Sequence, residues 1–235
     1  MKQKTAEIWL YGEIGSYWLD TISAKNFSEE IKKAKDAETI TVHVNSPGGD
    51  VFEGIAIYNM LRSHKATVDV EIEGLAASIA SIISLSGDTV RMAENAFFMI
   101  HNPWTAVFGE AKDLREAADK LDLVRDVLVQ TYAKKTGGKA TKEQIGAWMD
   151  AETWFTGKEA HANGFVDELT NTLDMAALVK FDFSRSKFIK NAPKTFPGSD
   201  EIVSLCSDQD KRARARIAHM TMWSQKFKTA SAIAA

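Results

Sequence analysis

The residues best suited to chemistry in this sequence are a serine, Ser78, and a histidine, His101. Ser78 follows a hydrophobic segment, 68–73, and precedes an apolar segment, 79–85, that Gly87 ends. This pattern predicts a strand, a tight turn and a helix, with the serine at the helix start, where the helix dipole favours negative charge. A serine becomes a nucleophile when a base removes its proton and N–H donors hold the oxyanion that forms. Taken alone, Ser78 could be an N-cap and His101 could be a structural histidine.

A glycine-rich turn provides candidate donors for such an oxyanion. Gly48 and Gly49 come after a strand-like segment, 39–44, and Pro47, and they precede a helix-like segment, 51–62. Because glycine has no Cβ, the backbone N–H groups of such a turn can approach a ligand closely. The alternative is an ordinary turn between a strand and a helix, since Pro-Gly pairs commonly mark turns.

Three motifs in this sequence occur together in the order and near the spacing typical of one family. They are residues 45–49, 74–79 and 99–103. In these motifs the sequence resembles the ClpP serine peptidases. The similarity continues through 155–160 and 163–167 and covers roughly residues 6–170. This resemblance implies the ClpP/crotonase-like spiral of βαβ units.

The resemblance also implies a role for each of the residues described above. Ser78 matches the nucleophile, and His101 matches the general base. Gly48 or Gly49, together with the amide of Ile79, matches the oxyanion hole. The joint occurrence of these residues favours catalysis over their separate structural roles.

The acid of a Ser-His-acid triad has two candidates in this sequence. An ungapped match to the family places Glu152 at the position of the acid, and Asp150 lies two residues earlier. Either carboxylate could orient the histidine and stabilise its charged form. We favour Glu152 because the match then needs no gap.

The remaining histidines and the cysteine indicate no metal or cofactor. The other histidines lack comparable neighbours in the sequence and are interpreted as structural or solvent-facing: His43, His64, His161 and His219. No group of cysteine and histidine has the spacing of a zinc site. No Walker-type loop is present, so we do not expect the chain to hydrolyse ATP.

The length and charge suggest one peptidase domain with an extension. We expect the peptidase domain at 1–180 and a linker with a C-terminal extension at 181–235. The net charge of −3 favours neither nucleic acid nor a membrane as a partner. The single cysteine, Cys206, fits a reducing cytoplasm. The N-terminal segment lacks the pattern of a signal peptide, which also favours a cytoplasmic location.

Alternating strand and helix patterns predict an α/β fold with parallel strands. We expect strands near 7–11, 39–44, 67–73, 89–92 and 96–100, and helices at 23–35, 51–63, 78–86 and 110–134. Ser23, Thr141 and Thr156 are candidate helix N-caps. In ClpP relatives the region of helix 110–134 is a protruding handle by which two rings meet. Its broad apolar stripe suits contacts with both its own subunit and a neighbour.

We therefore expect a serine endopeptidase of the ClpP type that acts on proteins or peptides within a homo-oligomeric ring, either as a single ring or as two stacked rings. The sequence resembles most the phage and prophage ClpP-related head-maturation branch, which implies phage structural or scaffold proteins as substrates. The first strand begins near Glu7 and leaves little room for the loops that engage an ATPase unfoldase, so we do not expect that partner. The alternatives are a crotonase-like acyl-CoA enzyme and a non-catalytic oligomeric scaffold.

Overall fold

The computed structural model describes residues 4–15 and 21–171 of the chain. The described elements, in order, are β1 (Thr5–Tyr11), α1 (Ala24–Lys33), β2 (Thr39–Ser46), α2 (Val51–Arg62), β3 (Thr67–Ala77), α3 (Ile79–Ser84), β4 (Thr89–Ala93), β5 (Phe97–Ile100), α4 (Ala111–Thr136), α5 (Lys142–Asp150), β6 (Thr153–Thr156), α6 (Gly157–Ala162) and β7 (Glu168–Thr170). The expected linker and extension, 181–235, lie outside the described residues.

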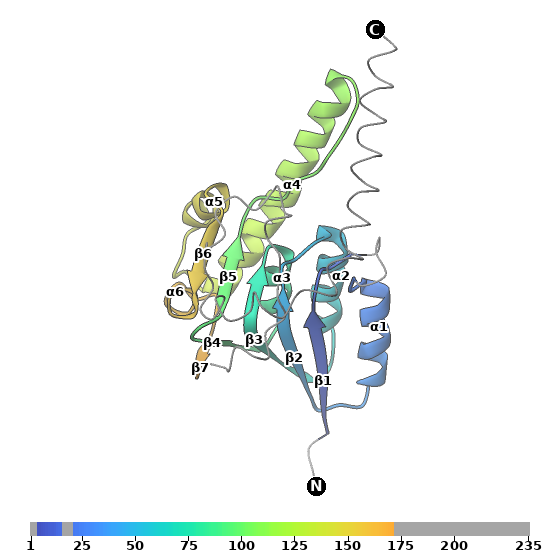
Figure 1. Ribbon diagram of the computed structural model, residues 1–235, viewed down its shortest axis with the longest axis vertical. Coiled ribbons are helices and arrows are strands. Elements are labelled where there is room, and N and C mark those ends of the chain that lie inside the picture. The colour runs from blue at the N-terminus through green and yellow to red at the C-terminus, as the bar shows by residue number, and fades with distance from the viewer. Residues whose placement is uncertain (1–3, 16–20, 172–235) are drawn as a thin grey trace, which may run out of the picture. The chain divides into compact units, whose positions relative to one another are not determined.

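The strands form a seven-stranded sheet that is mostly parallel (Figure 1). Its main order is β1-β2-β3-β4-β7, and all neighbours in this order are parallel. Strand β3 pairs with β4 through Asp69–Ile72 and then with β5 through Leu75–Ala77. Strand β6 adds to β5 in the antiparallel direction. The predicted α/β fold with parallel strands is confirmed.

The two faces of the sheet differ in polarity because side chains alternate along each strand. On β2, Ile40, Val42 and Val44 are buried in the main hydrophobic core, which also includes residues of α1, α2 and α3 such as Phe27 and Ile57. Burial of each such aliphatic side chain stabilises the fold by roughly 1.5–3 kcal/mol. The opposite face of the same strands carries polar side chains.

Helix α4 differs in burial along its length. Its C-terminal part is packed in the core, where Leu128, Val129 and Tyr132 are buried. Its N-terminal part extends beyond the sheet (Figure 1) and exposes Leu114 and Leu123. The predicted helix 110–134 is therefore confirmed as a protruding helix.

The predicted helix starts are also confirmed. The side chains of Ser23, Thr141 and Thr156 accept hydrogen bonds from backbone N–H groups at the start of α1, α5 and α6. Gly137, with φ of 59°, ends α4. In the described residues, no helix combines the length and the apolar character that a membrane span requires.

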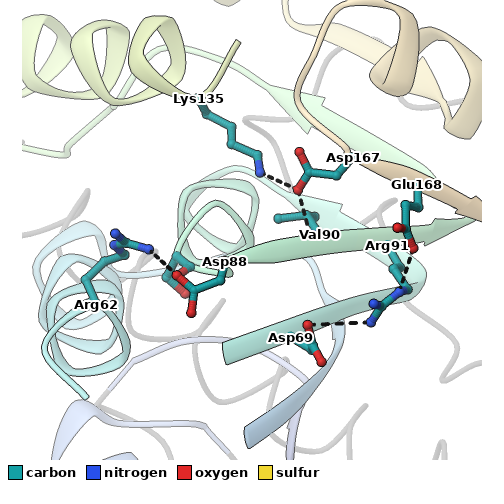
Figure 2. A network of polar contacts seen from close by, with 9 residues as sticks. Arg62, Asp69, Asp88, Val90, Arg91, Lys135, Asp167 and Glu168 are labelled. Atoms are coloured by element: carbon teal, nitrogen blue, oxygen red, sulfur yellow. Dashed lines mark hydrogen bonds and ion pairs between the residues drawn. The ribbon is translucent and has the colours of Figure 1, made fainter. Parts of the chain in front are cut away.

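Charged side chains fasten the last described strand and the end of α4 to the sheet (Figure 2). Asp167 accepts hydrogen bonds from the backbone N–H of Val90 at 2.7 Å and from Lys135 Nζ at 2.5 Å. Arg91 donates to Glu168 at 2.8 Å across the β4–β7 pair. These contacts hold α4 and β7 against β4. Strands β5 and β6 belong to the same sheet, because β5 pairs with β3.

Candidate active site

Ser78 occupies a strained turn between β3 and α3. Its φ of 56° and ψ of −129° lie in a region that residues with a Cβ rarely adopt. The backbone of Ser78 is held on both sides: its N–H donates to Met99 O at 2.9 Å, and its carbonyl accepts from the N–H of Ser81 at 3.0 Å. Its side chain makes no N-cap hydrogen bond, so the structure does not favour the capping role that the sequence left open.

The Ser78 hydroxyl instead contacts His101. The distance between Ser78 Oγ and His101 Nε2 is 2.7 Å. The β3–β5 pairing explains this contact, because Ala77 and Met99 are partners in the parallel ladder and both functional residues follow shortly after. Residues that are distant in the sequence therefore meet at the ends of two adjacent strands.

The surroundings of His101 favour its neutral form. Burial lowers the pKa of His101 below its ordinary value, because the charged imidazolium loses hydration, while the negative charge of Glu152 acts in the opposite direction. A neutral imidazole at neutral pH can accept a proton from the serine hydroxyl, as a general base must.

The pairing of strands β5 and β6 places Glu152 next to His101. In the antiparallel β5–β6 pair, Ile100 is the partner of Thr153, so the next residues outward on the two strands are His101 and Glu152. Glu152 is buried, with 8% of its surface exposed, and Trp154 Nε1 donates to its Oε1 at 3.4 Å. Among the described non-glycine residues, only Ser78 and Glu152 have a positive φ. Backbone strain of this kind concentrates at functional sites.

Asp150, the second candidate for the acid, has different partners. Its Oδ1 accepts hydrogen bonds from Asn102 Nδ2 at 2.8 Å and from Arg125 Nη2 at 3.0 Å. These bonds lower the pKa of Asp150, and its side chain is 61% exposed. Asp150 thus links α5 to α4 and to the residue after His101.

The glycine-rich turn lies directly against Ser78. A Cβ on Gly48, whose φ is 90°, would come within 2.7 Å of Ser78 Cβ and 3.1 Å of Ile79 N. The Gly48 N–H donates to Ser46 Oγ at 3.1 Å. For the N–H groups of Gly49 and Ile79, no acceptor is found among the described residues. These two amides, rather than that of Gly48, are therefore the available donors beside the serine.

A chain of hydroxyl groups links α4 to the backbone of Ser78, and no pattern in the sequence predicts it. The Tyr132 hydroxyl from α4 lies 2.6 Å from Ser81 Oγ, and Ser81 Oγ donates to the Ser78 carbonyl. Tyr132 is fully buried, and burial raises the pKa of its hydroxyl well above the ordinary value. Ser81 looks like one more residue of an apolar helix in the sequence, so only the fold reveals this support.

None of the other described histidines forms a hydrogen bond with Ser78. His64 Nδ1 accepts the backbone N–H of Ala66, and His161 is exposed in the last turn of α6. His43 contacts two carboxylates on β3. His219 and Cys206 lie outside the described residues.

Comparison with known proteins identifies the family. The model of the protein family described as "Clp protease" matches residues 3–172, which is most of the chain. The chain belongs to the Clp protease family. It is therefore a serine endopeptidase of the ClpP type, and the resemblance to this family drawn from the three motifs is confirmed.

Relatives and a solved structure agree with the family. The chain is 36% identical over 146 residues to ATP-dependent Clp protease proteolytic subunit 2 of Thermobifida fusca, covering 60% of this chain and 71% of that protein. It is 37% identical over 134 residues to the ATP-dependent Clp protease proteolytic subunit of Streptococcus gordonii, covering 55% and 67% of the two chains. The structure of a ClpP1 mutant from Listeria monocytogenes matches with a TM-score of 0.61 and 27% identity, covering 72% of this chain and 92% of that chain.

Proposed function

We propose that this Clp protease cleaves peptide bonds with Ser78 as nucleophile, His101 as general base and Glu152 as the acid. The observation that carries this proposal is the 2.7 Å contact between Ser78 Oγ and His101 Nε2 on a strained turn. The backbone of Ser78 is held by hydrogen bonds on both sides, and burial lowers the pKa of His101. A positioned hydroxyl and a neutral imidazole both favour proton transfer during nucleophilic attack.

In the first half of the reaction, the serine is acylated. His101 Nε2 accepts the Ser78 hydroxyl proton as Oγ bonds to the carbonyl carbon of the substrate. The negative oxygen of the tetrahedral intermediate is held by the N–H groups of Gly49 and Ile79. His101 then gives the proton to the leaving amine nitrogen, the C–N bond breaks and an acyl-enzyme remains.

In the second half, water takes the place of the amine. His101 accepts a proton from the water as its oxygen attacks the acyl carbon, and then returns a proton to Ser78 Oγ as the ester bond breaks. Glu152 stabilises the imidazolium that forms in each half, since its negative charge already raises the pKa of His101. We assign no direct role in these steps to Asp150.

Labelling with a fluorophosphonate probe tests this assignment. The wild-type chain should be labelled at Ser78, as read by mass spectrometry of the modified peptide, and Ser78→Ala and His101→Ala should not be labelled. Ser63→Ala is a matched control, because Ser63 is an exposed serine at the end of α2. The control should be labelled like the wild type. A crotonase-like enzyme or an inactive scaffold would give no label at Ser78, and either result would overturn the proposal.

We also infer that the exposed part of α4 mediates assembly into a homo-oligomeric ring, with a stacked pair of rings as one form of that assembly. Leu123 and Val127, which are four residues apart and so lie on one side of this helix, are 68% and 52% exposed. Soluble proteins rarely expose contiguous apolar patches unless a partner covers them. A closed ring would confine a peptidase in the cytoplasm, and phage structural or scaffold proteins are the substrates that we infer from the similarity to the head-maturation branch. An ATPase unfoldase is not part of this proposal.

Light scattering combined with a peptidase assay tests the assembly. The double change Leu123→Lys and Val127→Lys should reduce the mass of the particle and lower activity. Lys134→Glu changes an exposed residue near the buried end of the same helix and should leave the mass unchanged. A wild-type monomer with full peptidase activity would contradict the ring.

A further inference from the structure

A second group of reactive side chains lies on the polar face of the sheet. His43 on β2 and Glu71 and Glu73 on β3 place one potential ligand atom each within 4.8 Å of the others. His43 Nδ1 is 2.9 Å from Glu73 Oε1 and 3.8 Å from Glu71 Oε2. None of these residues belongs to the proposed catalytic group.

The strand register explains why these three side chains converge. His43 and Glu71 are partners in the parallel β2–β3 ladder. Glu73 is two residues further along β3 and therefore points to the same face of the sheet. Residues separated by a helix in the sequence thus form one cluster, which no spacing rule for metal ligands would detect.

The orientation of the His43 ring is fixed. The Trp9 ring stacks on it, with centroids 5.2 Å apart and an angle of 10° between the planes. His43 Nε2 is buried and has no hydrogen-bond partner among the described residues. Nδ1 is therefore the ring nitrogen that faces the two carboxylates.

The charge around this cluster is predominantly negative. The cation beside it is Arg91, which is the partner of Glu71 in the β3–β4 ladder and also pairs with Asp69 at 3.6 Å and Glu168 at 2.8 Å. The Tyr11 hydroxyl donates a hydrogen bond to Glu73 but carries no charge. Burial raises the pKa of Glu73, because the carboxylate loses hydration. A cation between the two glutamates would place a positive charge beside both carboxylates.

We propose that His43, Glu71 and Glu73 bind one divalent transition-metal ion, with Zn²⁺ as the ion that best suits the ligands. Imidazole and carboxylate are common zinc ligands, whereas Mg²⁺ and Ca²⁺ prefer oxygen ligands alone. Bonds of about 2.0–2.2 Å in a tetrahedral site place ligand atoms roughly 3.4 Å apart, which small side-chain rotations here would reach. Two carboxylates and a neutral imidazole balance the charge of the ion, and a water molecule completes the site.

Isothermal titration calorimetry of the full chain with ZnCl₂ tests this site. Wild-type protein should bind one Zn²⁺ per chain through the cluster, and Glu71→Gln should weaken that binding at least tenfold. Glu71→Gln is the most informative variant, because it keeps the bonds that link His43, Glu73 and Tyr11 and so keeps the fold. Its circular dichroism should match the wild type. His161→Gln removes an exposed histidine and should bind Zn²⁺ as the wild type does.

Two further measurements distinguish Zn²⁺ binding at this site from Zn²⁺ binding by other residues of the chain. Co²⁺ should give visible absorption that Glu71→Gln loses, and Zn²⁺ binding should change the fluorescence of Trp9, as judged against Trp9→Phe. Both Cys206 and His219 remain in every variant, so binding by them would survive Glu71→Gln and would overturn the proposal. Equal affinity for Mg²⁺ or the absence of Zn²⁺ binding would also overturn it. Fluorophosphonate labelling is measured separately, so the outcome does not depend on the catalytic assignment.

Discussion

The same sheet carries two histidines beside carboxylates, and they differ in what completes each group. His101 has a serine hydroxyl at 2.7 Å from one nitrogen and the charge of Glu152 nearby. His43 has carboxylates at 2.9 and 3.8 Å from one nitrogen, and no hydroxyl of the described residues hydrogen-bonds to its ring. A histidine beside a carboxylate is thus not sufficient to identify a catalytic base.

The backbone explains why the two groups diverge. Ser78 and Glu152 both lie at ends of strands with a positive φ, where the chain departs from regular structure. His43 and Glu71 are partners within the β2–β3 ladder, and Glu73 lies on β3 just where that ladder becomes irregular, so the three side chains converge on one face of the sheet. The first arrangement suits the proposed nucleophile, and the second suits the proposed ion.

Removal of the Ser78 hydroxyl should have the largest effect. We expect Ser78→Ala to reduce kcat/KM for a fluorogenic peptide by at least about 10³-fold, since loss of a triad member typically costs several orders of magnitude. The free energy of unfolding should stay within about 1 kcal/mol of the wild type, as measured by urea denaturation, because only one oxygen is removed. Substantial activity in purified Ser78→Ala would contradict the claim that His101, unlike His43, serves a nucleophilic serine.

Glu152→Gln should have the next largest effect, and it distinguishes the two acids. We expect a loss of about 10²–10⁴-fold in kcat, because an amide cannot stabilise the imidazolium. Asp150→Asn, compared in the same assay, should lose less than about tenfold, since its carboxylate is bonded to Asn102 and Arg125. The opposite order would assign the acid role to Asp150.

The pH dependence of kcat/KM tests the lowered pKa of His101. Only the neutral imidazole accepts the serine proton, so kcat/KM should fall tenfold per pH unit below the pKa of His101 in the free enzyme. Burial lowers this pKa below the ordinary value of 6.5, so activity should persist somewhat below pH 6.5. In Glu152→Gln the raising effect of the carboxylate is absent, and the residual activity should persist to still lower pH. An acid limb above pH 6.5 in the wild type would contradict the effect of burial.

The smallest effect concerns the hydroxyl chain below Ser78. Tyr132→Phe should lower the free energy of unfolding by about 1 kcal/mol, because one buried hydrogen bond to Ser81 is lost. Tyr58→Phe is the matched control, since no partner of the Tyr58 hydroxyl is found among the described residues. Urea denaturation of both variants measures the difference. Equal stability of the two variants would show that the Tyr132 bond contributes nothing.

Most of the framework was predictable from the sequence because it depends on local periodicity. The strand expected at 39–44 is β2, Thr39–Ser46, and the helix expected at 110–134 is α4, Ala111–Thr136. The strand expected at 67–73 continues to Ala77, since small residues carry the pairing from β4 to β5. Strands β6 and β7 were not predicted, because such short strands depend on partners that are distant in the sequence.

Only those residues of the site that lie within the family motifs were predictable from the sequence. The Ser78 and His101 pair follows from the family resemblance, whereas the preference for Glu152 over Asp150 gains support from the β5–β6 register, which no local pattern contains. The occupied N–H of Gly48 and the cluster around His43 likewise depend on contacts across strands. Physical interpretation of a sequence therefore identifies residue types more readily than their partners.

The hydroxyl chain from Tyr132 through Ser81 to the Ser78 carbonyl has a consequence for heat inactivation. It ties the strained serine to the buried end of α4, which is itself part of the main core. Local melting of the serine turn would break these bonds and leave buried hydroxyls without partners, so the turn has little freedom to loosen before the whole domain does. On heating, the enzyme should keep its turnover up to the onset of global unfolding and then lose both together.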